Sequence, residues 1–137
     1  MTILNFTNQV TRILENNKIQ YAVVGGCAKL IYHKNVSTSD LDILIDNSTN
    51  NITRFLHFME KHFKTKITLS KIRNYDVVKV KATPYSLDFH FNLDGVSNKN
   101  IFEHLHLHLI EHNPVQFISE KNLLKNLNKV ANKNGIH

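Results

Sequence analysis

The sequence lacks several features that would define a protein class. It has one cysteine, Cys27, so an internal disulfide is excluded and a reducing compartment is favoured. No apolar run approaches the roughly 20 residues of a membrane span. The first ten residues, MTILNFTNQV, do not join a basic region to an apolar block as a signal peptide does. We therefore expect a cytoplasmic protein with no membrane partner.

The chain also lacks any linker that would divide it. Its 137 residues are enough for one hydrophobic core, so we expect a single domain over 1–137. Lys and Arg number 17 against 11 Asp and Glu, and this formal net charge of +6 favours a polyanionic partner such as nucleic acid or a triphosphate. The lysines are scattered, however, and the richness in Asn and Lys also fits an AT-biased genome.

Hydrophobic periodicity predicts an α+β (α/β) fold with a mixed sheet and helices packed mainly on one face. Apolar residues at helical spacing predict a first helix that ends at Asn16–Asn17. The later elements follow in chain order: a strand at 19–26, a short helix at 27–33, a strand at 41–46, a helix at 52–63, and antiparallel strands at 66–72, 76–82 and 85–92. The segment 102–112 begins as helix and ends as strand, and a strand at 115–118 leads to a C-terminal helix capped by Ser119.

Two aspartates interrupt the apolar strand LDILID. Residues two apart on a strand share a face, so Asp40 and Asp42 project together, opposite Leu41 and Ile43. Two carboxylates this close repel unless a positive charge lies between them. A divalent cation such as Mg²⁺ supplies that charge and prefers oxygen ligands.

The later segment YSLDFHFN offers a third carboxylate. Asp88 joins the pair if its strand lies beside 41–46, and three such carboxylates suit two metal ions roughly 3.5–4 Å apart, the arrangement for nucleotidyl transfer. Gly25 and Gly26 end one strand and open a helix, so their backbone N–H groups are suited to a phosphate. Each motif alone is most simply a turn or a solvated edge; the combination is more specific.

These motifs together resemble the nucleotidyltransferase superfamily with the DNA polymerase β-like fold. Val24-Gly25-Gly26 is followed, after thirteen residues, by Asp40-Leu41-Asp42, with Thr38 and Ser39 before it. The tail PVQFISEKNLLKNL resembles the closing strand and helix of small members. The short chain resembles minimal nucleotidyltransferases of the antitoxin type, which are often paired with a small helical HEPN protein.

The resemblance implies a role for each motif. Asp40 and Asp42 would bind Mg²⁺ (or Mn²⁺), and Asp88 would bind the catalytic metal and help to deprotonate the attacking hydroxyl. Gly25 and Gly26, with Ser39, would hold the β- and γ-phosphates of a nucleoside triphosphate. The reaction would transfer a nucleoside monophosphate, AMP from ATP being the first expectation, to a protein or RNA (tRNA) acceptor and release pyrophosphate.

The sequence departs from the family pattern at Val36, where many members carry arginine; Lys29 or Lys34 could supply that charge. Two other interpretations stay open. The chain could be a catalytically weak toxin–antitoxin module that works through a protein partner, or a plain nucleic-acid-binding domain.

Several further residues have competing interpretations. His104, His106, His108 and His112 could bind zinc but fit a solvated face better. His90, on the face of Asp88, could orient a phosphate or lie on the surface. Asp94 is the alternative third metal ligand. Asp46 fits a turn or cap, and Cys27 fits a small buried residue.

Overall fold

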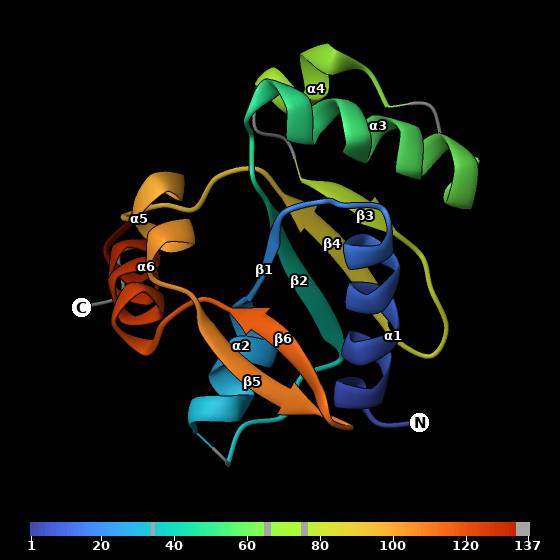
Figure 1. Ribbon diagram of the computed structural model, residues 1–137. Helices are drawn as coiled ribbons and strands as arrows, with labels where there is room; N and C mark the ends of the chain where they lie inside the picture. Colours follow the sequence, from blue (N-terminus) through green and yellow to red (C-terminus); the bar gives the residue numbers. More distant parts are fainter. Residues whose placement is uncertain (34, 65–66, 75–76, 134–137) are drawn as a thin grey trace.

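Six strands and six helices are present in the part of the chain that the computed structural model describes, residues 1–33, 35–64, 67–74 and 77–133 (Figure 1). The helices are α1 (Ile3–Asn16), α2 (Gly25–Tyr32), α3 (Thr49–Phe63), α4 (Leu69–Arg73), α5 (Asn98–Glu103) and α6 (Glu120–Lys133). The strands are β1 (Tyr21–Val24), β2 (Asp40–Ile45), β3 (Val78–Val80), β4 (Ser86–His90), β5 (His106–Ile110) and β6 (Asn113–Phe117).

The strands form one mixed sheet in the order β3-β4-β2-β1-β6-β5. β2 lies inside it, antiparallel to β1 and parallel to β4, while β3 and β5 form the two edges. The predicted α+β class and mixed sheet are therefore confirmed. All four residues of β1 and the apolar residues of β2 are buried, as expected for central strands.

One predicted strand is wrong. The segment predicted as a strand over 66–72 contains helix α4 instead, where the side chain of Thr68 accepts a hydrogen bond from the backbone N–H of Lys71. This cap offers the backbone an alternative to a sheet ladder, and only Ile72 of the helix is buried. The strand predictions also covered residues 66 and 76, which lie outside the described residues. The other predicted strands are present, and β3 pairs antiparallel with β4 as expected.

The helices pack through apolar faces onto the sheet. On α1, Phe6 and Leu14 are buried, and a capping box between Thr2 and Asn5 satisfies free N–H groups at its start. In Figure 1, α1 lies at the right of the strands and α3 lies above them, whereas α5 and α6 lie together at the left. None of the helices in the described part of the chain has the length and apolarity needed to cross a membrane.

An aromatic cluster joins α3 to β4. The ring of Phe55 lies 5.0 Å from that of Phe89 and 5.4 Å from that of Phe91, edge to face in both pairs. Asn51, at the start of the same helix, is buried and hydrogen-bonds the backbone of Gln20 and Asp46. These contacts fix α3 to the C-terminal end of β2, away from Asp40 and Asp42.

We expect Phe55→Ala to lower the free energy of unfolding by about 3–5 kcal/mol, because it removes a fully buried ring and leaves a cavity. Urea denaturation followed by circular dichroism measures this change. Ile13→Ala is the control, because Ile13 is 40% exposed, and its effect should be well under half as large. Equal losses of stability in the two variants would contradict this packing.

Candidate functional site

The parallel register of β2 and β4 brings the predicted carboxylates together. Asp40 lies beside Ser86, and Asp42 lies beside Asp88. Because these positions alternate with buried residues such as Leu41 and Leu87, the acidic side chains share one face of the sheet. Residue 88 therefore projects to the same side as the other two.

Two polar side chains of β4 contact the carboxylates. The hydroxyl of Ser86 donates a hydrogen bond to Oδ1 of Asp40. Nε2 of His90 lies 2.9 Å from Oδ1 of Asp42, and about one fifth of each of these two side chains is exposed. His90 is therefore not a detached surface residue, because it holds one oxygen of the acidic pair.

The charges of the site act on Asp88. Burial raises the pKa of its carboxyl above the ordinary value of 3.8, and the negative charges of Asp42 and, more weakly, Asp40 raise it too. Lys79 of β3, directly opposite Asp88 in the sheet, and His90 lower this pKa but do not cancel the rise. Burial and the neighbouring carboxylates thus outweigh the two groups that lower the pKa of Asp88.

The glycine turn lies against the second aspartate. Gly25 has a φ of +63°, and a Cβ placed on it would be 2.5 Å from Oδ2 of Asp42. A Cβ on Gly26 would be 2.7 Å from Oγ1 of Thr38, in the loop before β2. Both positions therefore require glycine for close approach, and Gly25 also requires it for its backbone conformation.

The start of α2 leaves backbone donors available. Val24, which precedes this helix, makes no side-chain capping bond, and the first turn contains no acidic residue. The N–H groups at a helix start attract anions. The face of carboxylates and this start of α2 are adjacent, because Asp42 pairs with Val24 across the sheet.

The remaining nearby residues have different positions. Ser39 is exposed in the bend before β2. Cys27 is fully buried, as expected, with its thiol 3.6 Å from the carbonyl oxygen of Asp40, and burial raises its pKa to about 11. Lys29 is exposed on α2 and Val36 is half-buried, while Lys34 lies outside the described residues.

The two alternative acids lie elsewhere. Asp94 is in the turn between Leu93 and Val96, and its carbonyl oxygen accepts a hydrogen bond from the amide of Asn126. Asp46 follows β2 and accepts a hydrogen bond from the hydroxyl of Ser48, which fits the predicted turn role. Neither residue belongs to the paired register of β2 and β4 that holds the other three.

The four histidines are spread over the end of α5, strand β5 and the turn after β5, where His112 lies. His104 ends α5, whereas His106 and His108 share one face of β5 with ring centroids 6.2 Å apart. His106 also packs on the ring of Tyr32, and His108 packs on Phe117. Among the described residues, no group of three or more His, Cys, Asp or Glu side chains is arranged so that it could hold a metal ion.

The three carboxylates nevertheless match a divalent cation in their chemistry, and they lie on the same face of two adjacent strands. They are hard oxygen donors, and burial together with the negative charge of Asp42 raises the pKa of Asp88. In the observed orientation, one oxygen of Asp40 points to Ser86 and one of Asp42 to His90. Holding a cation therefore requires these side chains to turn toward it.

The sequence pattern places Ser86 on the face of Asp88 and His90 but predicts no contact for it, and it does not predict that Lys79 belongs to the site. Both residues alternate with more buried neighbours along their strands, so the period of two predicts the face of the sheet on which each side chain lies. Their partners could not be read from that period, because it does not specify which strands are neighbours.

Comparisons with known proteins agree with this architecture. No protein-family model and no curated protein matches the sequence. A protein from Thermotoga maritima proposed to be a nucleotidyltransferase has a similar structure, with a TM-score of 0.70 and 11% identity over 98% of this chain and 90% of its own. An antigenic nucleotidyltransferase-like protein from Paracoccidioides brasiliensis gives a TM-score of 0.53 and 15% identity over 88% of this chain, which spans 62% of that protein's chain. The chain has the nucleotidyltransferase fold.

We expect Asp88→Asn to raise the melting temperature at neutral pH in the presence of EDTA, because it removes a charge that the folded protein stabilises poorly. A raised carboxyl pKa means that the ionised form costs stability above the folded-state pKa. The cost disappears as the pH falls through that pKa and below 3.8, so the difference in melting temperature should shrink toward zero in acid. Calorimetry over this pH range measures it; a stabilisation that is absent at neutral pH or grows in acid would contradict the electrostatics.

Gly25→Ala should lower the free energy of unfolding by about 1–3 kcal/mol, because a left-handed backbone strains any residue with a Cβ. The contact with Asp42 adds to this cost. In an Asp42→Ala background the same substitution should cost less, since the carboxylate is gone. Urea denaturation of the four proteins in this double-mutant cycle measures the difference. Equal losses of unfolding free energy in both backgrounds would show that the contact with Asp42 does not contribute to the cost.

Proposed function

We propose that the protein is a metal-dependent nucleotidyltransferase. The hydroxyl of an acceptor attacks the α-phosphorus of a nucleoside triphosphate; a new O–P bond forms, the bond to the β-phosphate oxygen breaks, and pyrophosphate leaves. The observation that supports this most directly is the register that pairs Asp42 with Asp88 beside the glycine turn. A carboxylate cluster next to uncapped helix N–H groups suits a triphosphate with its cation.

Each residue has a role in this proposal. Asp40, Asp42 and Asp88 hold Mg²⁺ or Mn²⁺, which, when bound, stabilises charge on the entering and leaving oxygens. Asp88 also accepts the proton of the acceptor hydroxyl, a role that its raised pKa supports. The backbone N–H groups at Gly25 and Gly26 bind the β- and γ-phosphates, with Ser39 at the entrance.

His90 positions the cluster in the proposal. Its contact with one oxygen of Asp42 leaves the other, Oδ2, facing the glycine turn. Ser86 likewise holds one oxygen of Asp40. Side chains that orient ligating carboxylates commonly support metal sites in this way.

The finer assignment follows from the resemblance to small nucleotidyltransferases. We take ATP as the nucleotide and a protein or an RNA such as tRNA as the acceptor. A small helical HEPN-type protein is the candidate partner.

Asp42→Asn should reduce transfer by at least about 100-fold, because it removes a ligand and a charge at the reacting phosphate. The test incubates the protein with each α-³²P-labelled nucleoside triphosphate, Mg²⁺ or Mn²⁺, and either total tRNA or a candidate protein partner. Asp46→Asn is the matched control, since it removes a carboxylate from the end of the same strand without touching the cluster. It should retain transfer.

Equal loss of transfer in the Asp42 and Asp46 variants would contradict the proposed site. Absence of transfer from the wild-type protein with every nucleotide and acceptor, together with tight binding to the helical partner, would favour the weakly catalytic antitoxin interpretation.

A further inference from the structure

A concave site lies between α5 and α6, and none of the three aspartates of the carboxylate cluster is among its lining residues. It has a volume of about 410 Å³, which is within the range of small-ligand pockets. We call it the α5–α6 pocket. Its lining residues are Asn100, His104, Ser119, Lys121, Asn122 and Lys125.

The pocket is basic. Lys121 and Lys125 are four residues apart on α6, so they share a face of the helix, and both are exposed. No Asp or Glu is among its described lining residues. The two acids of these helices have other neighbours, because Glu103 lies 4.0 Å from Nζ of Lys99 and Glu120 lies 3.8 Å from Nε2 of His33.

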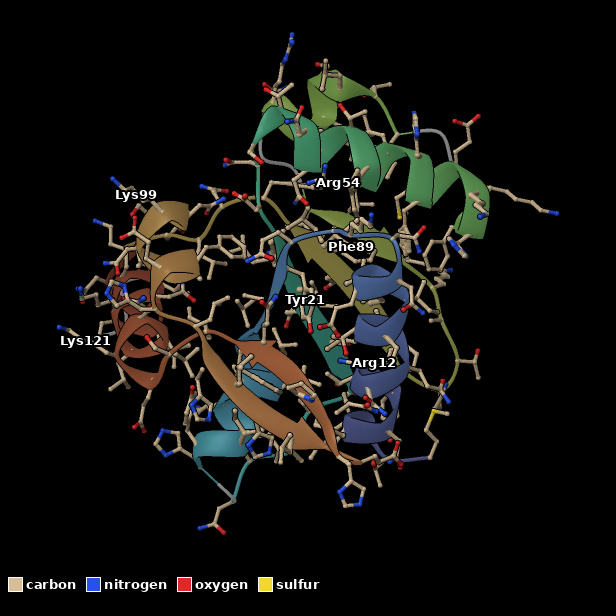
Figure 2. The ribbon with its side chains drawn as sticks, viewed as in Figure 1. Arg12, Tyr21, Arg54, Phe89, Lys99 and Lys121 are labelled. Carbon is tan, nitrogen blue, oxygen red and sulfur yellow. The ribbon has the colours of Figure 1, made fainter. Side chains whose placement is uncertain are left out.

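The pocket also offers a ring on which a base can stack. His104 is exposed and has a flat ring of the kind on which RNA bases stack, and the hydroxyl of Ser119 lies at the start of α6, where it accepts a hydrogen bond from the backbone N–H of Asn122. Nδ1 of His104 lies 2.9 Å from the carbonyl oxygen of Asn100, which fixes the ring to the end of α5. In Figure 2, Lys99 and Lys121 both project from the side of the molecule formed by α5 and α6.

The backbone connects this pocket to the candidate active site. The backbone N–H of Ile118, one residue before Ser119, donates to the carbonyl oxygen of Val23 at 3.0 Å, two residues before Gly25. The hydroxyl of Tyr32, at the end of α2, donates to the carbonyl oxygen of Ile118 at 2.7 Å. The start of α6 is thus held beside the strand that leads into the glycine turn.

We infer that the α5–α6 pocket binds the phosphodiester backbone of a single-stranded RNA acceptor and guides its end toward the nucleotide. This inference rests on the proposed function and names the acceptor class as RNA. The chemistry that carries it is two exposed lysines and a histidine around a concave surface with no acidic residue among its described lining residues. The triphosphate itself is the other phosphate source, but the glycine turn and the carboxylate cluster already provide its site.

The test measures the affinity of the full chain for a fluorescein-labelled single-stranded RNA of mixed sequence, by anisotropy over a range of salt concentrations. The double variant Lys121→Gln/Lys125→Gln should bind about tenfold more weakly at low salt. Its log–log salt slope should be shallower by about 1.4, because each phosphate of a single strand that a lysine no longer neutralises reduces the slope by roughly 0.7. Lys61→Gln/Lys71→Gln, on α3 and α4, makes the same change in net charge and should bind as the wild type does.

Calorimetric titration with ATP and Mg²⁺ separates the two phosphate sources. ATP affinity should be unchanged in the Lys121/Lys125 variant. Loss of ATP affinity with RNA affinity retained would overturn the inference. Equal loss of RNA affinity in the two double variants, or no RNA binding by the wild-type protein, would also overturn it. RNA binding that depends on Lys121 and Lys125, in a protein that transfers no nucleotide, would uphold the pocket while the proposed function fails.

Discussion

The repulsion among carboxylates on one face of a central strand is the constraint on which the rest of the site depends. Asp40 and Asp42 occupy β2, where paired strands on both sides hold the backbone and keep the two residues on one face of the sheet. The sheet then adds Asp88 beside them, and Lys79 on the neighbouring strand lowers the pKa of Asp88 without cancelling its rise. Such an arrangement costs stability, and proteins retain local costs of this kind chiefly at functional sites.

The surrounding structure offsets this cost by packing. The apolar residues that alternate with the acids are fully buried, and the aromatic cluster around Phe55 fixes α3 to the same strands. On the acidic face, His90 and Ser86 each contact a carboxylate oxygen. The site therefore has a backbone held by strand pairing on both sides of β2 and carboxylate oxygens held by contacts from β4.

The glycine turn and the α5–α6 pocket share a structural origin. β1 ends in the turn, and β6 runs parallel beside β1 before it leads into α6. A parallel pair delivers the starts of two helices, α2 and α6, to the same end of the sheet. This arrangement places the two surfaces that we propose for anions, one for the nucleotide and one for the acceptor strand, at the same end of the sheet.

The sequence by itself determined the central strands, the terminal helices and the face on which each acid lies, because these follow from periods of 2 and 3.6 residues and from glycine at the turn. It did not determine α4, where a local threonine cap outweighed an alternating pattern. Only the tertiary structure decided that β4 lies parallel to β2 with Asp88 beside Asp42, that Lys79 faces them, and that two lysines of α6 line a pocket with α5. Strand order and helix docking are set by contacts between distant segments, and no local pattern encodes them.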